Sequence, residues 1–272
     1  MLYQICHHRR LSVPSRAEIT PVQTDSTQNE AVRLEGLSNR EFLERFAAPG
    51  RIGLCGGRTL IDKAICRAER HLDPGKQWSV WSHAFLFEGV RADGRHWVIE
   101  SDLQIHRKHI QLGVQENRME KYFDENLYTS LAVLDFGLSE PQVAGLVAEA
   151  LELVANHERY SLRELIGTLL ALKNPGLRAR QNLLARGSSL FCSAFVQHLF
   201  RKSGLDLVPG VDLKNTTPED LARTAVPHRC WSSQREPAAH GLTKIKARLR
   251  GRVAARLRRR PRTDPEKDGR PA

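Results

Sequence analysis

Cys192 lies in the segment Phe191-Cys-Ser-Ala-Phe195, which has the apolar spacing of a buried-face helix. With Ser188 or Ser189 as the N-cap, Cys192 falls in the first turn. There the unpaired N–H groups and the positive end of the helix dipole favour a thiolate and can hold an oxyanion. A free cysteine is also often a small buried apolar residue, so position alone leaves both interpretations open.

His83 interrupts the apolar run of residues 80–88, where a polar side chain needs a partner. Residues 80–88 and 95–102 are strand-like and are joined by the glycine-bounded turn 89–94. Pairing the two turn glycines predicts a register that places Glu100 opposite His83 on one face. Glu100 would then orient the imidazole while its other nitrogen meets a thiol. His198 is a poorer base for Cys192, because a six-residue offset turns it to another helix face.

Periodicity and capping residues predict the surrounding elements. Ser38 with Glu41 forms a capping box, and Thr217-Pro218 is typical of a helix start. Helices are expected to begin at Ser38, near Leu60, after Ser139 and at Thr217, and a further helix is expected over residues 162–172. Further strands are expected over residues 51–55 and 131–136.

Five motifs occur in a characteristic order: Gly50-Arg-Ile-Gly-Leu54, Trp81-Ser-His83, Trp97-Val-Ile-Glu100, Phe191-Cys-Ser-Ala-Phe195 and Thr217-Pro-Glu-Asp-Leu221. Over residues 50–225 the chain resembles the circularly permuted papain-like hydrolases of the NlpC type. It is most similar to the YiiX-like branch, and lecithin:retinol acyltransferase is a more distant likeness. The resemblance implies an α+β fold with an antiparallel sheet packed on helices, in which histidine and acid precede the cysteine.

The resemblance also implies roles for three residues: Cys192 as nucleophile, His83 as general base and Glu100 as the residue that orients it. The expected reaction is attack on an amide or ester carbonyl, a thioester intermediate, and hydrolysis or acyl transfer, without a cofactor. One position departs from the pattern, since relatives have Asp where this chain has Arg51.

A length of 272 residues suits one hydrophobic core. We expect a polar, flexible lead-in over residues 1–37, a catalytic domain over 38–230 and a basic tail over 231–272. The chain has five cysteines, which is an odd number, and it contains no CxxC pair. Both observations favour reduced thiols. The sequence shows no signal peptide and no apolar run long enough to span a membrane, so a cytoplasmic location is expected.

The positive charge is concentrated at the C-terminal end. Residues 240–272 hold twelve Lys or Arg against three acids, a net +9, which leaves +2 of the chain's +11 for residues 1–239. Residues 242–260 have the pattern of a basic amphipathic helix, suited to an anionic membrane surface or a partner groove. Nucleic acid is not expected, because no aromatic residue lies among these charges. A solvated extension is the simpler alternative.

The sequence allows two other interpretations. His106 and His109, with His96, Cys192 or His198, can be drawn as a zinc site. Their three-residue offset suits a helix, whereas this stretch is strand-like, so we expect no metal. The chain can also be a non-catalytic papain-like binding module tethered by its tail, although the presence of cysteine, histidine and glutamate favours an enzyme.

Overall fold

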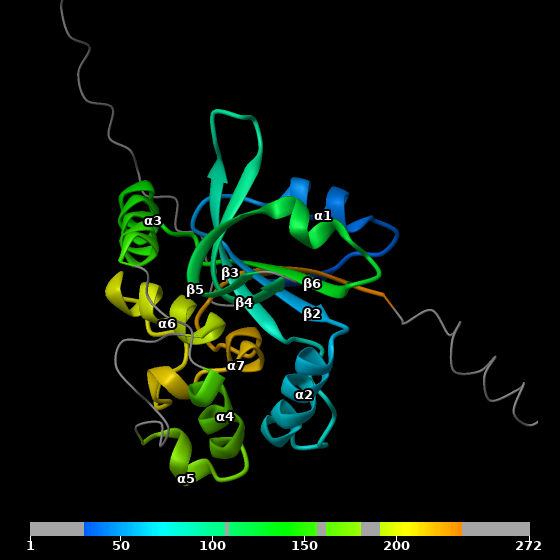
Figure 1. The fold of residues 1–272 in the computed structure, drawn as a ribbon, viewed down its shortest axis with the longest axis vertical. Helices are drawn as coiled ribbons and strands as arrows, with labels where there is room; N and C mark the ends of the chain where they lie inside the picture. The colour runs from blue at the N-terminus through cyan, green and yellow to red at the C-terminus, as the bar shows by residue number, and fades with distance from the viewer. Residues whose placement is uncertain (1–29, 107–108, 157–161, 181–190, 236–272) are drawn as a thin grey trace, which may run out of the picture.

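The computed structural model describes residues 30–106, 109–156, 162–180 and 191–235 (Figure 1). Its strands are β1 (Glu30–Arg33), β2 (Ile52–Gly57), β3 (His83–Val90), β4 (His96–His106), β5 (His109–Arg118), β6 (Tyr128–Asp135) and β7 (Arg229–Gln234). Its helices are α1 (Asn39–Phe46), α2 (Leu60–Glu69), α3 (Glu140–Ala155), α4 (Leu162–Ala171), α5 (Pro175–Arg178), α6 (Cys192–Lys202) and α7 (Pro218–Ala222), with short 3₁₀ turns η1 (Arg70–Leu72), η2 (Met119–Phe123) and η3 (Leu213–Asn215). The fold is therefore α+β, as expected.

The strands form one sheet in the order β1-β7-β6-β2-β3-β4-β5. Neighbouring strands are antiparallel except β1 and β7, which are parallel. The sheet extends across both expected domain boundaries, because β1 precedes residue 38 and β7 continues past residue 230. The rest of the expected lead-in and tail lies outside the described residues.

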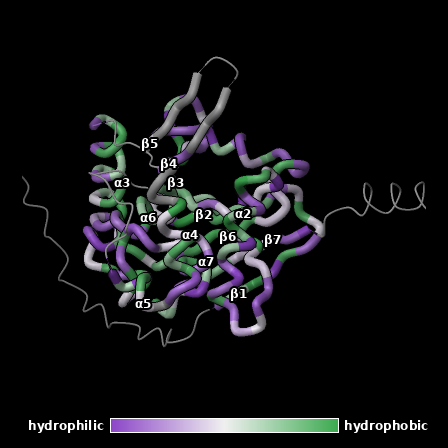
Figure 2. The backbone as a smooth tube through the Cα atoms, turned by 60° about the horizontal axis from the view of Figure 1, so that its bottom comes forward, coloured by the Kyte–Doolittle hydropathy of each residue, from purple (hydrophilic) through white to green (hydrophobic). Residues whose placement is uncertain are grey.

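The two faces of the sheet carry different cores, because side chains alternate along each strand. Ala84 and Leu86 of β3 lie on the face covered by α3, α6 and α7. Phe85 and Phe87 lie on the other face, against Phe42 of α1. Figure 1 shows α1 on the opposite side of the sheet from α6 and α7. In Figure 2 hydrophobic colouring gathers along these central strands, which are buried on both sides.

Local capping signals predicted several helix starts correctly. Ser38 caps α1 and Thr217 caps α7, each in a capping box, and Ser139 caps α3. The prediction for α6 was wrong in detail, because its N-cap is Phe191 rather than Ser188 or Ser189. The carbonyl of Phe191, a fully buried residue, accepts the first bond of the helix from Phe195 N–H at 2.8 Å. Cys192 is consequently the first residue of α6.

The predicted register of the β3–β4 hairpin was also wrong. Leu86 pairs with Ile99, and a bulge between Phe87 and Gly89 adds one residue before Val90 pairs with His96. The strands therefore continue past the first turn glycine. If this register is continued to the start of β3, Asp102 lies opposite His83. Glu100 is then two positions away from the pairing that the sequence predicted. A shift of two preserves the face of the sheet, so Glu100 still lies on the face of His83.

Candidate active site

His83 and Glu100 are in direct contact. Nε2 of His83 lies 2.5 Å from Oε2 of Glu100, whose side chain is fully buried. His83 is the first residue of β3 and pairs with Cys55 of the neighbouring strand β2. Because Nε2 faces the carboxylate, Nδ1 is the ring nitrogen left for another partner.

Four donors converge on the carboxylate of Glu100. Oε1 accepts hydrogen bonds from Asn117 Nδ2 and Lys121 Nζ, each at 2.8 Å. Oε2 accepts from the Tyr122 hydroxyl at 2.5 Å in addition to His83. These bonds use the lone pairs of both oxygens. The carboxylate is therefore held in one orientation and has no acceptor position to spare.

The charges around Glu100 keep it ionised. Burial acts to raise its pKa, but the charge of Lys121 and the hydrogen bond from His83 hold the pKa of Glu100 well below its usual range. Burial opposes the charge on Lys121 as well, yet Glu100 and Asp102 together raise the pKa of this ammonium above its usual value. Lys121 Nζ lies 2.5 Å from Asp102 Oδ2 and so bridges the two carboxylates.

Cys192 meets His83 at the end of the sheet. It begins α6, and its side chain is buried in the core on the α6 face. Burial acts to lower the pKa of His83, but the charge of Cys192, its hydrogen bond to the ring and the bond to Glu100 raise the pKa of His83 well above its usual value. Cys192 and Glu100 thus both favour the protonated form of the His83 ring.

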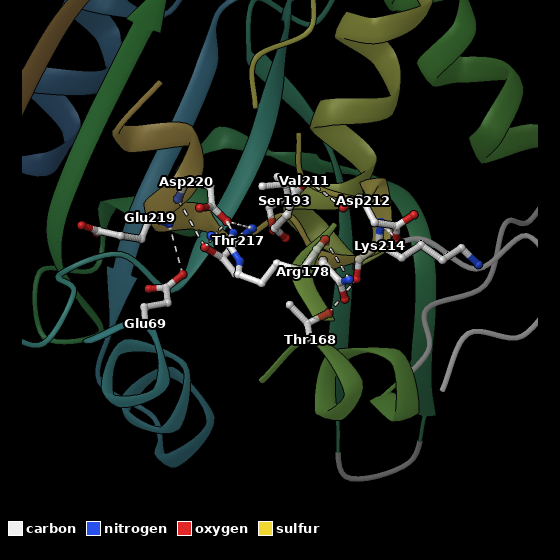
Figure 3. A network of polar contacts seen from close by, with 12 residues as sticks. Glu69, Thr168, Arg178, Ser193, Val211, Asp212, Lys214, Thr217, Glu219 and Asp220 are labelled. Carbon is white, nitrogen blue, oxygen red and sulfur yellow. Dashed lines mark hydrogen bonds and ion pairs between the residues drawn. The ribbon is translucent and has the colours of Figure 1, made fainter. Parts of the chain in front are cut away.

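The start of α6 is fixed by contacts distant in sequence. The Ser193 hydroxyl donates to the carbonyl of Thr216 at 2.8 Å, just before the N-cap of α7. Figure 3 shows Ser193 beside Thr217 and Asp220 in this polar network, which Arg178 of α5 joins through its ion pair with Asp220. The N–H groups of the first turn of α6 have no acceptor within the helix, which is the general condition of a helix start.

The other described thiols lie in different surroundings. Burial raises the pKa of Cys55 well above its usual value and that of Cys66 to about 12, and it also raises the pKa of Cys230. Cys66 donates to the carbonyl of Trp81. Cys6 lies outside the described residues. Among the described cysteines, a hydrogen bond to a histidine is found at Cys192 alone.

His83, Glu100 and Asp102 place one ligand-type atom each within 4.8 Å of one another. This donor set does not suit a metal ion. All four acceptor positions of Glu100 are in use, and the Lys121 ammonium lies between the two carboxylates where a cation would bind.

In the alternative zinc set, His198 lies on a different element from the pair His106 and His109. His106 and His109 are partners at the ends of β4 and β5, and their side chains lie outside the described part of the structure. His198 contacts Glu149 of α3 at 3.2 Å, which is consistent with the expectation that it faces away from Cys192.

Arg51, at the position where the hydrolases that the sequence resembles have Asp, makes three contacts. Its guanidinium pairs with Asp135 at 2.7 Å, donates to the carbonyl of Phe46 and lies 4.9 Å from the ring centre of Trp231. Arg51 therefore ties the start of β2 to β6, α1 and β7, a structural role on the side of the sheet that carries α1.

Sequence reasoning missed Asn117, Lys121 and Tyr122. Asn117 is the second-to-last residue of β5, and the other two lie in η2, a short turn that no periodicity marks. The one available signal was a polar residue near the end of the strand that pairs with β4. Using this signal requires the correct β4–β5 register, in which Asn117 pairs with Val98, two residues before Glu100.

Comparisons with known proteins give little beyond this geometry. No family model matches the chain, and no curated protein matches it. Among solved structures, the crystal structure of metalloprotein yiiX from Escherichia coli O157:H7 (DUF1105) is similar over 71% of this chain and 99% of its own, with 13% sequence identity and a TM-score of 0.45. A similarity of this size establishes neither a family nor an activity. No helix within the described residues is both long enough and apolar enough to cross a membrane.

Proposed function

We propose that the chain is a cysteine hydrolase or acyl-transferase of the circularly permuted papain-like, NlpC-type class, acting on an amide or ester bond. The observation that carries the proposal is His83, whose ring contacts Cys192 on one side and Glu100 on the other. The order histidine, acid, cysteine along the chain supports the permuted arrangement. So does the position of Cys192 at the start of a helix packed against the sheet that carries His83.

In the proposed reaction the thiolate of Cys192 attacks the carbonyl carbon of the substrate and forms a tetrahedral adduct. The protonated His83 gives its proton to the leaving amine or alcohol as the C–N or C–O bond breaks, which leaves a thioester. Neutral His83 then takes a proton from water or from a second nucleophile. As that nucleophile attacks the thioester, the C–S bond breaks, the acyl product leaves and the thiolate is restored beside the protonated ring.

Glu100 acts through His83 in this mechanism. As a carboxylate it accepts the Nε2–H. This bond fixes the ring and leaves Nδ1 for the thiol in the proposed mechanism. It also stabilises the positive charge that the ring carries before the leaving group departs. Lys121, Tyr122 and Asn117 hold the carboxylate ionised and in place.

The first turn of α6 supplies the oxyanion site in the proposal. The N–H groups of Cys192 and Ser193 have no intrahelical acceptor and lie at the positive end of the helix dipole. A carbonyl oxygen attacked by Cys192 develops its charge beside these groups. The bond from Ser193 to Thr216 fixes this turn before substrate arrives, so little reorganisation is needed in the transition state.

The test uses the intact chain with panels of acyl nitrophenyl esters and peptidyl aminomethylcoumarin amides, which also separates ester from amide substrates. Native protein should turn over at least one panel and accumulate an acyl adduct on Cys192 that hydroxylamine removes. Cys192→Ala should abolish both, whereas the matched variant Cys230→Ala should retain both. Trapping with an added amine separates hydrolysis from transfer.

The contrary outcome is a folded native chain that turns over neither panel and forms no adduct at Cys192 with acyl-like electrophiles. That result would overturn the enzyme and favour the non-catalytic binding module. The proposed membrane contact of residues 242–260 lies outside the described residues.

A further inference from the structure

Helices α2 and α4 lie side by side beneath the sheet (Figure 1), and a groove of about 550 Å³ opens between them. Its walls come from α2 with η1, from Trp78, and from α4 with Lys173, which follows it. The volume falls within the usual range of about 300–1,000 Å³ for sites that bind small organic ligands. The groove thus has the size of a binding site for one molecule.

Several large apolar side chains that line the groove are exposed to solvent. Nine large hydrophobic side chains are exposed in the described part of the chain, and four of them line this groove: Leu60, Trp78, Ile166 and Leu170. Leu60 is 84% exposed. Large apolar side chains gathered at one exposed site are typical of a surface that binds something, whereas scattered ones need no explanation.

Five of the described side chains that line the groove are of basic residue types. They are Lys63, Arg67, Arg70, His71 and Lys173. None of the ion pairs found among the described residues involves one of these five, although Arg67 lies 5.9 Å from the ring centre of Trp78.

Acidic side chains near the groove are engaged elsewhere. Glu69 of α2 is 1% exposed and accepts from the backbone of Glu219, while Asp62 binds Thr59 and Ser82. The positive field is evident at His71. Partial burial and the charges of Arg70, Lys76 and Lys173 lower the pKa of this imidazole. Among the described side chains, the rim therefore carries positive charge without an ion-pair partner around an apolar cleft.

We propose that this groove binds a single anionic amphiphile, with its hydrocarbon chain along Leu60, Ile166 and Leu170 and its carboxylate or phosphate on the basic rim. Apart from His71 and the Trp78 indole, the described side chains of the lining are apolar or cationic, so the groove offers charge but little hydrogen bonding to a neutral polar ligand. The chain's own basic tail, with a net +9, has the wrong sign to fill it. This inference uses no property of Cys192 and is independent of the proposed reaction.

The test is fluorescence titration of the full chain with an anthroyloxy-labelled fatty acid below its micelle concentration, and with the methyl ester of the same acid. The acid should bind at least tenfold more tightly than the ester. Arg67→Gln combined with Lys63→Gln should weaken binding of the acid about tenfold and leave binding of the ester nearly unchanged. Ala64→Trp, which fills the groove without changing charge, should weaken both.

Leu127→Ser is the matched control, since Leu127 is 48% exposed and does not line the groove. It should bind like the native chain, and Cys192→Ala should also bind normally even if the proposed reaction is wrong. Circular dichroism of each variant checks the fold. If Ala64→Trp does not fold, Leu170→Ala, which shortens an exposed apolar side chain of the lining, should weaken binding of both ligands. Equal binding of acid and ester, no effect of the groove substitutions, or binding of an acidic amphipathic peptide in preference to the acid would each overturn the proposal.

Discussion

Replacing Glu100 with Gln changes one atom type in a fully buried side chain and so tests how the site is held. A carboxylate accepts all four of its donors, whereas an amide offers one acceptor oxygen and an NH₂ that must face donors. The donors of His83, Tyr122, Asn117 and Lys121 cannot all be satisfied. Losing one partner of a buried charged pair costs about 3–5 kcal/mol, and we expect the free energy of unfolding to fall by about that amount.

The same substitution acts on His83. Glu100 contributes to the raised pKa of His83, so Glu100→Gln lowers that pKa. The proposed reaction needs the imidazolium, which is lost as the pH rises through this pKa. The alkaline limb of the kcat/KM profile should therefore move to lower pH, and kcat/KM at neutral pH should fall by about 10²- to 10⁴-fold, the range seen when an orienting carboxylate is lost from a triad.

Two assays check this prediction: urea unfolding at pH 7 and the pH profile of kcat/KM on the substrate that the panels identify. Glu116→Gln is the matched control, because Glu116 lies on the adjacent strand and pairs with the half-exposed Arg91. It should lose little stability and keep the native pH profile. A Glu100→Gln protein with native stability and an unshifted alkaline limb would refute the reasoning.

Three further predictions follow from the site and the charge distribution. Iodoacetamide at pH 6 should modify Cys192 well before Cys66, whose pKa burial raises to about 12, as judged by peptide mass spectrometry; equal rates would remove the physical basis for the nucleophile. Lys121→Met should cost about 3 kcal/mol in urea unfolding at pH 7. Because Lys121 lowers the pKa of Glu100, that stabilisation is present above the unfolded pKa of about 4.5 and is lost as the pH falls below it; a cost independent of pH would contradict this account. Removing residues 240–272 should leave turnover nearly unchanged and sharply weaken salt-sensitive co-sedimentation with anionic vesicles, and equal sedimentation of both proteins would exclude a membrane role for the tail.

Features set by local sequence were predicted well. The capping box of Ser38 and Glu41 lies within four residues, and its 2.7 Å bond forms as expected. The pairing of His83 with Glu100 was also predicted, although the register behind it was wrong. It survived because the bulged hairpin moved Glu100 by two positions, and alternation along a strand repeats every two residues. A shift of one would have separated the pair.

Features set by distant contacts were not predictable in the same way. Strand β1 is four residues long and mostly exposed, and it pairs with β7 across almost two hundred positions, as in Glu30 with Arg229. No periodicity in so short a segment marks it as a strand. Lys121 and Tyr122 were missed for a related reason, because a 3₁₀ turn has no hydrophobic pattern and only the folded sheet brings it to Glu100.

The place of β7 in the sheet bears on the order in which the molecule can assemble. β7 lies between β1 and β6, so the earliest described strand gains its neighbour only when the latest one is available. Until then β6 presents an unpaired edge, a hazard for association between chains during synthesis. A chain cut at residue 230 would keep that edge permanently. We expect this truncated chain to aggregate, even though it retains His83, Glu100 and Cys192.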